Sequence, residues 1–316
     1  MLGFLSGNAL VALASISSGH GLTEAILGPP DVAGGWYLGP GWLFIGGPDN
    51  PTFGRNHITQ SAFLALAAMI ALGRAWNVWH GRGSMAICLL WIIGGLLYLQ
   101  PIFLMQSRTG YLLTVTLVLY WIFIFIRYLT VKKAVVPIFI LTVGVFTMVA
   151  ANHHVVTRVN LMVESGREYI VERSMTDSGV RLEFWKSSIE ILTSNPTVGV
   201  GLGGFAEAYS RLPHQQEMLK VSRNQPHSEY ALILVQSGLV GCAIFLLLIF
   251  FCMKNGIFLL KERPEAMGLI VLYFFDGIFN SVIWDLAEGH ILPIIVLYCH
   301  MAVGKDFIAS RKEVEN

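Results

Sequence analysis

The sequence predicts an all-α polytopic membrane protein with about eight transmembrane helices, and two observations carry this prediction. Hydrophobic residues make up 54% of the 316 residues and charged residues only 13%, and the mean hydropathy is +0.62. These values lie outside the range of soluble globular proteins. Long apolar runs recur along the chain without the alternation of a transmembrane barrel strand. Because only helices and closed barrels satisfy backbone hydrogen bonds in lipid, the runs are predicted to be helices.

Eight apolar runs approach the length of about 20 residues that a helix needs to cross a bilayer. The first and the last are short for a span, and the first lacks the basic region of a secretory signal peptide. In chain order the runs are Leu2–Ser18, Ile58–Trp76, Met85–Met105, Tyr111–Leu129, Ala134–Val156, Tyr230–Met253, Ala266–Trp284 and Ile291–Gly304.

Basic residues divide the connecting segments into two sets and so predict the orientation. One set of alternate loops, with the C-terminal tail, holds Arg74, Arg82, Arg127, Lys132, Lys133, Lys254, Lys261, Arg263, Lys305, Arg311 and Lys312. The other set of short loops holds Arg108 and the acidic residues Asp285 and Glu288. Because Lys and Arg gather in cytoplasmic loops, the first set is predicted to be cytoplasmic. In a bacterial inner membrane the second set then faces the periplasm.

A polar stretch from about Thr157 to Pro226 separates the fifth and sixth apolar runs. We expect N-terminal transmembrane helices at 1–156, one large helical periplasmic loop with active-site residues at 157–229, and C-terminal transmembrane helices with a cytoplasmic tail at 230–316. ATP and nucleotide sugars are not available on the periplasmic face. Glycosyl chemistry there would therefore need a lipid-linked donor.

Charge and cysteine usage exclude several classes of function. The net charge of +1 gives no indication of a nucleic-acid partner. All four cysteines lie in apolar stretches and the polar stretch has none, so neither a disulfide framework nor a cysteine metal site is predicted. Val198–Phe205 superficially resembles a phosphate-binding glycine loop, but no Lys-Ser/Thr follows it. A tight turn that lets Phe205 and Tyr209 pack inward is the preferred interpretation.

The polar stretch is expected to contain a helix that starts near Gly179, capped by Asp177 or Ser178, and ends at Asn195-Pro196. One apolar stripe on it is formed by Leu182, Trp185, Ile189 and Leu192. Arg181 would lie in its first turn, where a cation opposes the helix dipole. Together with the helix N-terminus, Arg181 predicts an anion site.

Three motifs follow one another along the chain. They are Ser107–Leu113 at the opening of a span, Arg181–Trp185 followed by Asn195–Phe205, and Pro226–Leu232 with His227, followed by Gln236–Gly241. In this order they resemble motifs of the O-antigen ligase and polymerase family. The resemblance covers about Phe53 to Gly304. This chain has Ser228 where the family more often has Asn, Gln236 where it often has Glu, and fewer N-terminal spans.

The resemblance implies transfer of a glycan from undecaprenyl diphosphate to an acceptor hydroxyl, such as a lipid A-core sugar, without a metal or other cofactor. It implies that Arg108 and Arg181 hold the donor diphosphate and that His227 is the catalytic histidine. Arg223 is a possible further contact. The chemistry agrees, because Arg binds diphosphate in bidentate geometry and a neutral imidazole can accept the hydroxyl proton. Direct attack would invert the anomeric centre.

Alternatives remain open at this level. A polysaccharide polymerase or a protein O-oligosaccharyltransferase belongs to the same family, while a membrane transporter or flippase, or a non-catalytic relative, would use the chain differently. Arg108 would then simply reach lipid headgroups, and Arg181 would pair with Glu183 or Glu172. Asp276, inside a predicted span, is either functional or paired with a polar group such as Asn280.

Overall fold

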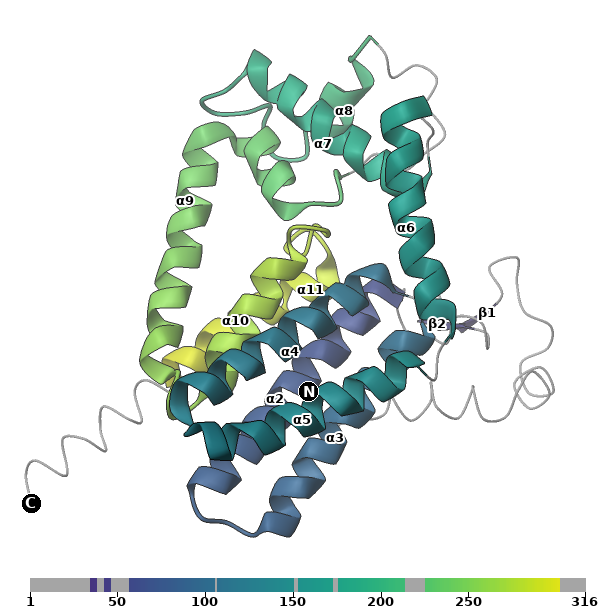
Figure 1. The fold of residues 1–316 in the computed structure, drawn as a ribbon. Helices are drawn as coiled ribbons and strands as arrows, with labels where there is room; N and C mark the ends of the chain where they lie inside the picture. The colour runs from purple at the N-terminus through teal and green to yellow at the C-terminus, as the bar shows by residue number, and fades with distance from the viewer. Residues whose placement is uncertain are drawn as a thin grey trace, which may run out of the picture. The chain divides into compact units, whose positions relative to one another are not determined.

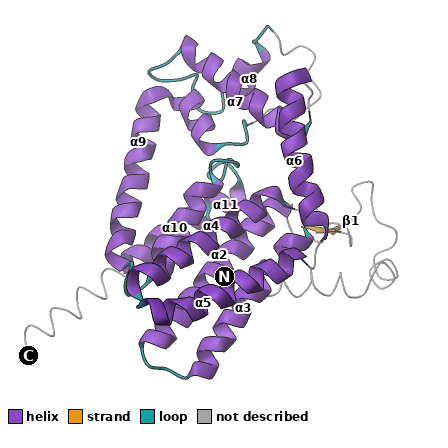
Figure 2. Ribbon diagram, in the orientation of Figure 1, coloured by secondary structure: helices purple, strands orange, loops and turns teal. Residues whose placement is uncertain are grey.

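A computed structural model of the chain describes residues 35–38, 43–46, 57–105, 107–150, 153–172, 176–213 and 225–301. The predicted span Leu2–Ser18, the candidate residue Arg223 and the tail from residue 302 lie outside these ranges. In chain order the elements are β1 (Gly35–Leu38), β2 (Leu43–Gly46), α2 (His57–His80), α3 (Met85–Leu104), α4 (Arg108–Tyr128), α5 (Val131–Ala150), α6 (His153–Glu172), α7 (Asp177–Ser194), α8 (Phe205–Ser210), α9 (Glu229–Leu259), α10 (Pro264–Asp276), α11 (Leu286–Gly289) and a last helix Ile291–Met301 (Figure 1, Figure 2).

The helical fold class is confirmed, with one small addition. The four-residue strands β1 and β2 pair antiparallel, with Gly35 opposite Gly46 and Leu38 opposite Leu43. They lie in the Gly- and Pro-rich segment ahead of the first described helix. Every longer element is a helix.

Five of the described helices are long and apolar enough to cross a bilayer, namely α2, α3, α4, α5 and α9. They correspond to five of the eight predicted spans. The predicted span Ala266–Trp284 is wrong as one helix, because α10 has 13 residues and ends at Asp276. There the Asp276 carbonyl accepts hydrogen bonds from the amides of Phe279 and Asn280, which turns the chain. A 13-residue helix is only about 20 Å long.

The described residues fall into two compact units. The first comprises the residues up to Arg158 together with Leu259–Leu272, and the second comprises Val159–Phe258 and the residues from Tyr273 onward. Each unit is described by itself.

In the first unit, α2 is the central helix, and 78% of its most apolar stretch of 18 residues is buried in the protein. It packs against α3 and α4. The start of α10 joins this core, because the Trp76 indole donates to the carbonyl of Lys261 and the Tyr120 hydroxyl donates to that of Pro264. Gly73 makes room for Glu265, whose Cγ lies 2.6 Å from where a Cβ would stand. By contrast, only 11% of the most apolar 18-residue stretch of α5 is buried in the protein.

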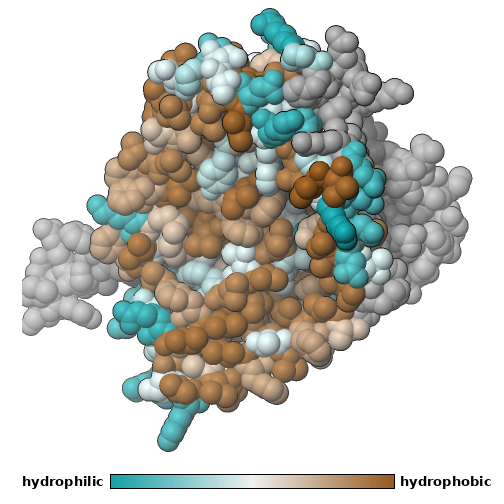
Figure 3. Space-filling model, turned by 45° about the horizontal axis from the view of Figure 1, so that its top comes forward, coloured by the Kyte–Doolittle hydropathy of each residue, from teal (hydrophilic) through white to brown (hydrophobic). Residues whose placement is uncertain are grey.

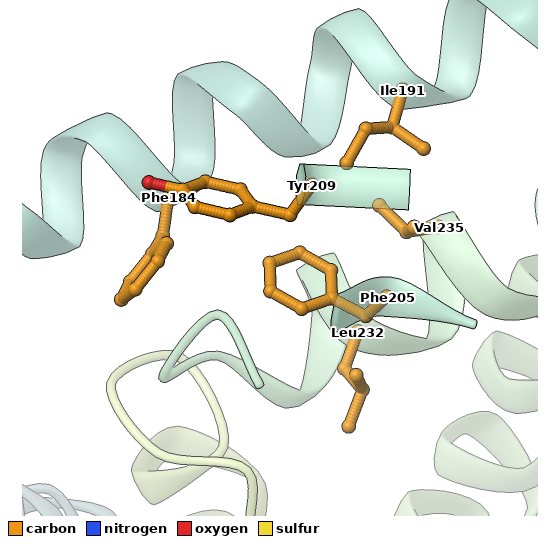
Figure 4. Packing of buried hydrophobic residues seen from close by; sticks show 6 residues of the cluster. All are labelled: Phe184, Ile191, Phe205, Tyr209, Leu232 and Val235. Atoms are coloured by element: carbon orange, nitrogen blue, oxygen red, sulfur yellow. The ribbon is translucent and has the colours of Figure 1, made fainter. Parts of the chain in front are cut away.

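In the second unit, α7, α8 and the start of α9 share one hydrophobic core. Figure 4 shows its residues, which are Phe184, Ile191, Phe205, Tyr209, Leu232 and Val235. The rings of Phe184 and Tyr209 meet edge to face at 5.1 Å, an arrangement that aromatic pairs prefer. The expectation that Phe205 and Tyr209 pack inward is confirmed, since both are fully buried.

The apolar stripe predicted on α7 is not the face that packs into this hydrophobic core. Ile189 is 63% exposed, whereas Phe184 and Ile191 on another face are buried. The helix has apolar side chains on two faces, and the face that meets the aromatic rings of α8 is the buried one. That face also holds Glu183, whose carboxylate accepts hydrogen bonds from Tyr169 of α6 and Ser187.

The prediction of one continuous helix over Tyr230–Met253 needs correction. Gly238 has φ 62° and ψ −161°, which divides α9 into a first part, Glu229–Ser237, and a second part, Leu239–Leu259. The ribbon of α9 turns sharply near its start (Figure 1). Large exposed apolar side chains on α9, among them Leu239 and Ile244, all follow this break. Figure 3 shows hydrophobic side chains, in brown, over most of the face that it draws.

Candidate functional site

His227 stands two residues before α9, as the sequence suggested. Its φ of 52° lies in the left-handed region, which is unusual for a residue with a side chain. His227 is half-buried, and its two neighbours in the sequence, Pro226 and Ser228, are buried. The Ser228 hydroxyl accepts a hydrogen bond from the amide of Ala231 at 3.4 Å, so Ser228 acts as the N-cap of α9. Strained backbone of this kind persists only where the surroundings hold it in place.

Glu229 ties this turn to the segment after α10. Its amide donates to the carbonyls of Gly277 and Asn280, at 2.8 and 3.0 Å. Its carboxylate accepts a hydrogen bond from the amide of Ile283 at 2.8 Å. Three bonds therefore fix the segment 277–283 beside His227. Sequence reasoning missed this contact, because it joins residues about 50 positions apart.

The environment of His227 favours a neutral imidazole. Burial lowers the pKa of the His227 side chain below its ordinary value, and the nearby Arg181 guanidinium lowers that pKa further. The ring also lies 5.9 Å from the ring of Phe184, centroid to centroid. A neutral imidazole at neutral pH can accept a proton, which is the requirement for a general base.

Arg181 lies on α7 and is half-buried. The helix begins at Asp177 after the N-cap residue Thr176, so Arg181 comes just beyond the first turn and not within it. The predicted caps Asp177 and Ser178 are likewise one or two residues late. Since the helix dipole acts mainly within the first turn, it contributes less to an anion site at Arg181 than the sequence suggested. The charge of the guanidinium itself remains.

The charge of Arg181 acts on the carboxyl group of Asp276 as well as on His227. The suggested pairing of Asp276 with Asn280 is confirmed, because the side-chain amide of Asn280 donates a hydrogen bond to the Asp276 carboxylate at 2.5 Å. Asp276 is 4% exposed. The second unit therefore brings together an imidazole, a guanidinium and a buried carboxyl group, contributed by three separate segments.

The glycine-rich segment fastens α7 to the break in α9. The amides of Val200 and Gly201 donate to the carbonyls of Val235 and Gln236, at 2.9 and 3.0 Å. In return the amides of Leu239 and Val240 donate to Pro196 and Thr197, at 2.8 and 3.1 Å. These four bonds are called the clasp below.

Two glycines make the clasp possible. A Cβ on Gly199 would lie 2.6 Å from the carbonyl carbon of Gln236, and one on Gly238 would lie 2.6 Å from the amide nitrogen of Gly199. Both glycines also have positive φ. The clasp thus joins the helix that carries Arg181 to the helix that His227 precedes. Its sequence signal was the glycine run, which was expected to form a turn but not to break α9.

Arg108 belongs to the first unit, where it is the first residue of α4 and half-buried. Ser107 caps this helix by accepting a hydrogen bond from the Gly110 amide at 3.1 Å, and its hydroxyl also lies 2.8 Å from that of Ser61 on α2. Gly110 allows the close approach, since a Cβ there would stand 2.7 Å from that of Ser61. Packing thus explains Ser107 and Gly110.

One comparison with known proteins gives a match. Residues 94–246, almost half of the 316 residues, match the family model described as O-antigen ligase. The matched range includes Arg108, Arg181, the clasp and His227. Among curated proteins no match to the chain is found. The chain has several helices able to span a bilayer, which indicates a multi-pass membrane protein. Over residues 94–246 it is similar to the O-antigen ligase family, whose members are membrane glycosyltransferases and ligases.

Proposed function

We propose that this protein transfers a glycan from undecaprenyl diphosphate to a hydroxyl group of a lipid A-core sugar, at the periplasmic face of a bacterial inner membrane. The observation that carries this proposal is the site of the second unit. There the half-buried His227 has a lowered pKa, caused by its burial and by the nearby positive charge of Arg181. The match to the O-antigen ligase family supports the class of reaction.

The reaction forms one bond and breaks one bond. The acceptor hydroxyl oxygen attacks the anomeric carbon of the first sugar of the donor, and the bond from that carbon to the diphosphate oxygen breaks. The His227 imidazole takes the hydroxyl proton as the new glycosidic bond forms. The electron pair of the broken bond stays on the leaving undecaprenyl diphosphate. Attack opposite to the leaving group inverts the anomeric configuration.

Arg181 balances the charge that grows on the leaving diphosphate. A guanidinium keeps its charge at every physiological pH and offers paired donors to phosphate oxygens. Arg108, at the amino end of α4, is proposed to provide a second cation for the same diphosphate. The basic loops predicted to be cytoplasmic support a periplasmic position for all three residues.

The central test is transfer in proteoliposomes that contain the lipid-linked donor and a lipid A-core acceptor. We expect His227→Ala to lower the rate by about 100-fold or more, as loss of a general base does. Arg181→Ala should do the same, and Arg181→Lys should restore little, because a lysine lacks the paired donors. Suitable controls are His300→Ala and Arg211→Ala, both at exposed positions. Near-normal transfer by the His227 or Arg181 variant would refute the proposal.

The pH dependence of His227 gives a second test. Since its pKa is lowered, the imidazole is neutral at neutral pH, and transfer should fall only when acid carries the pH through that lowered value. Arg181→Gln removes a positive neighbour and should raise the pKa, so the protonation midpoint moves to higher pH. Diethylpyrocarbonate labels neutral imidazole, and peptide mass spectrometry after labelling at a series of pH values reports the midpoint at His227. A midpoint that moves to lower pH would contradict the assignment.

The same proteoliposomes distinguish the proposed ligase from a polymerase, a protein glycosylation enzyme and a flippase. Replacing the core acceptor by a growing polysaccharide or by an acceptor protein tests for polymerase or protein glycosylation activity. Movement of the lipid-linked glycan across the bilayer without any transfer would instead indicate a flippase. Cysteines placed at positions 108, 181 and 227 should react with impermeant reagents from the periplasmic side. Labelling only from the cytoplasmic side would exclude the proposed site.

A further inference from the structure

Trp185 follows Arg181 by four residues on α7, so the two side chains project from the same face of the helix with Cβ atoms about 6 Å apart. Trp185 is half-buried. Its ring lies 6.4 Å from that of Phe279, centroid to centroid, with 40° between the ring planes. Phe279 belongs to the segment that follows Asp276. The face of α7 that carries Arg181 therefore continues as a pair of aromatic rings.

The position of Phe279 is fixed by backbone contacts. Its amide donates to the carbonyl of Asp276 at 2.9 Å. The next residue, Asn280, is held by its side-chain bond to Asp276 and by the bond that its carbonyl accepts from the Glu229 amide. The aromatic pair is thus fastened to the same segment as the carboxyl group that Arg181 acts on.

The indole of Trp185 has an unused donor. Its Nε1 atom is shielded from solvent and has no hydrogen-bond partner among the residues that the structure describes. Leaving such a donor unpaired costs about 1 to 3 kcal/mol, so buried indoles usually find an acceptor. The hydroxyl of Ser281, two residues after Phe279 and 3% exposed, is likewise buried without a partner in the described part of the chain. Within the described residues, two donors on facing segments therefore lack acceptors.

We propose that Trp185 and Phe279 bind the first sugar of the donor, the one attached to the diphosphate. This proposal rests on the function proposed above, because it places the diphosphate at Arg181. A ligand held there extends one helical turn along α7 and meets the aromatic pair. A sugar ring offers C–H groups to aromatic faces and oxygen atoms to the free donors. A polyprenyl chain offers no acceptor, so it would leave the Nε1 hydrogen unpaired.

The test compares two lipids bound to the full-length protein in nanodiscs. One is undecaprenyl diphosphate and the other is the same lipid carrying a single sugar. Trp185→Phe keeps an aromatic ring but removes the N–H group, and it should weaken binding of the sugar-bearing lipid by about 2- to 10-fold. Binding of the lipid without sugar should be unchanged. Trp185→Ala removes the ring as well and should weaken binding of the sugar-bearing lipid further.

Trp284→Phe is the matched control, since Trp284 belongs to the same unit and is 48% exposed. It should leave both affinities unchanged. In the transfer reaction, Trp185→Phe should raise the KM for the donor more than it lowers kcat, because the sugar is held both before and during transfer. A variant that merely disturbed folding would weaken both lipids alike and lower the melting temperature.

The outcomes separate the two proposals. Equal loss for both lipids, or no loss for either, would overturn the sugar contact at Trp185 while leaving the proposed function intact, provided that Arg181→Ala still abolishes binding of undecaprenyl diphosphate. If wild-type protein binds neither lipid, or if Arg181→Ala binds both normally, the proposed function fails and the sugar contact fails with it.

Discussion

The two parts of α9 have similar apolar sequences but different surroundings. In the first part, Leu232 and Val235 are buried in the core with α7 and α8, and the backbone is held by the clasp. In the second part, Leu239 and Ile244 are 58% and 64% exposed. The second part is also about 31 Å long, which is the thickness of a bilayer core. We infer that the protein holds the first part and that lipid surrounds the second.

In the proposed arrangement, this difference lets a membrane helix also serve a site outside the bilayer. An unbroken helix would carry the residues before it along its own axis. The break at Gly238 lets the first part pack with α7, the helix that carries Arg181, while the second part takes its own direction. The clasp therefore couples the position of His227 to α7 and the glycine-rich segment. Four sets of substitutions test this comparison, in order of decreasing expected effect.

The largest effect is expected at the clasp. Gly238→Ala and Gly199→Ala place a Cβ against backbone atoms and impose positive φ on a residue with a side chain, so each should cost about 4 kcal/mol of folding free energy. Gly203→Ala is the control, because Gly203 has φ 77° but open space around a Cβ, and strain alone costs about 1 kcal/mol. SDS-induced unfolding in mixed micelles measures the difference. Equal effects at Gly203 and Gly238 would argue against the clasp.

A matched pair of leucines tests burial on either side of the break. Leu232→Ala removes a side chain that is 2% exposed and should cost about 3 kcal/mol through the cavity that it leaves. Leu239→Ala removes one that is 58% exposed and should change stability by less than about 0.5 kcal/mol. The same unfolding assay applies to both. If Leu239→Ala were as costly as Leu232→Ala, the second part of α9 would be packed in protein and not in lipid.

Two substitutions by arginine test where along the chain the bilayer begins. Leu247→Arg puts a cation near the middle of the second part of α9, on a side chain that is 54% exposed, and should cost about 2.5 kcal/mol of insertion free energy. Leu202→Arg changes a leucine of the glycine-rich segment that is 89% exposed and should be tolerated, since that segment lies outside the bilayer in the proposed arrangement. An insertion assay with a glycosylation reporter measures both. Poor insertion of the Leu202 variant would contradict this placement.

The smallest effect is expected at the cap of α9. Ser228→Ala removes the hydroxyl that accepts the Ala231 amide, and because this bond is long the loss should be about 0.5 kcal/mol. Ser228→Asn should be neutral, because Asn caps helices as well as Ser does. It also introduces the residue that is commoner in the family. A large loss of transfer with normal stability in the Asn variant would show that Ser228 contacts substrate, in addition to capping the helix.

Much of the site was predictable from local sequence. The motifs located Arg108 at the start of α4, Arg181 near the start of α7 and His227 just before α9, because caps, glycines and prolines act within a few residues. The pairing of Asp276 with Asn280 was predictable because the two residues are only four apart, although the structure forms the contact across the turn after α10 and not on a helical face. Arg223 lies outside the described residues, so its role stays a prediction.

The tertiary structure decided what depends on distant neighbours. Apolarity and spacing by themselves determined that the chain forms membrane-crossing helices with a helical polar segment between them, because a helix satisfies its own backbone in lipid. They did not determine which face of α7 is buried, that α10 ends at Asp276, or that α9 breaks at Gly238. Each of these depends on contacts between segments far apart in the chain, such as Pro196 with Leu239. No local pattern encodes such a contact, because both partners must be in place before either conformation is stable.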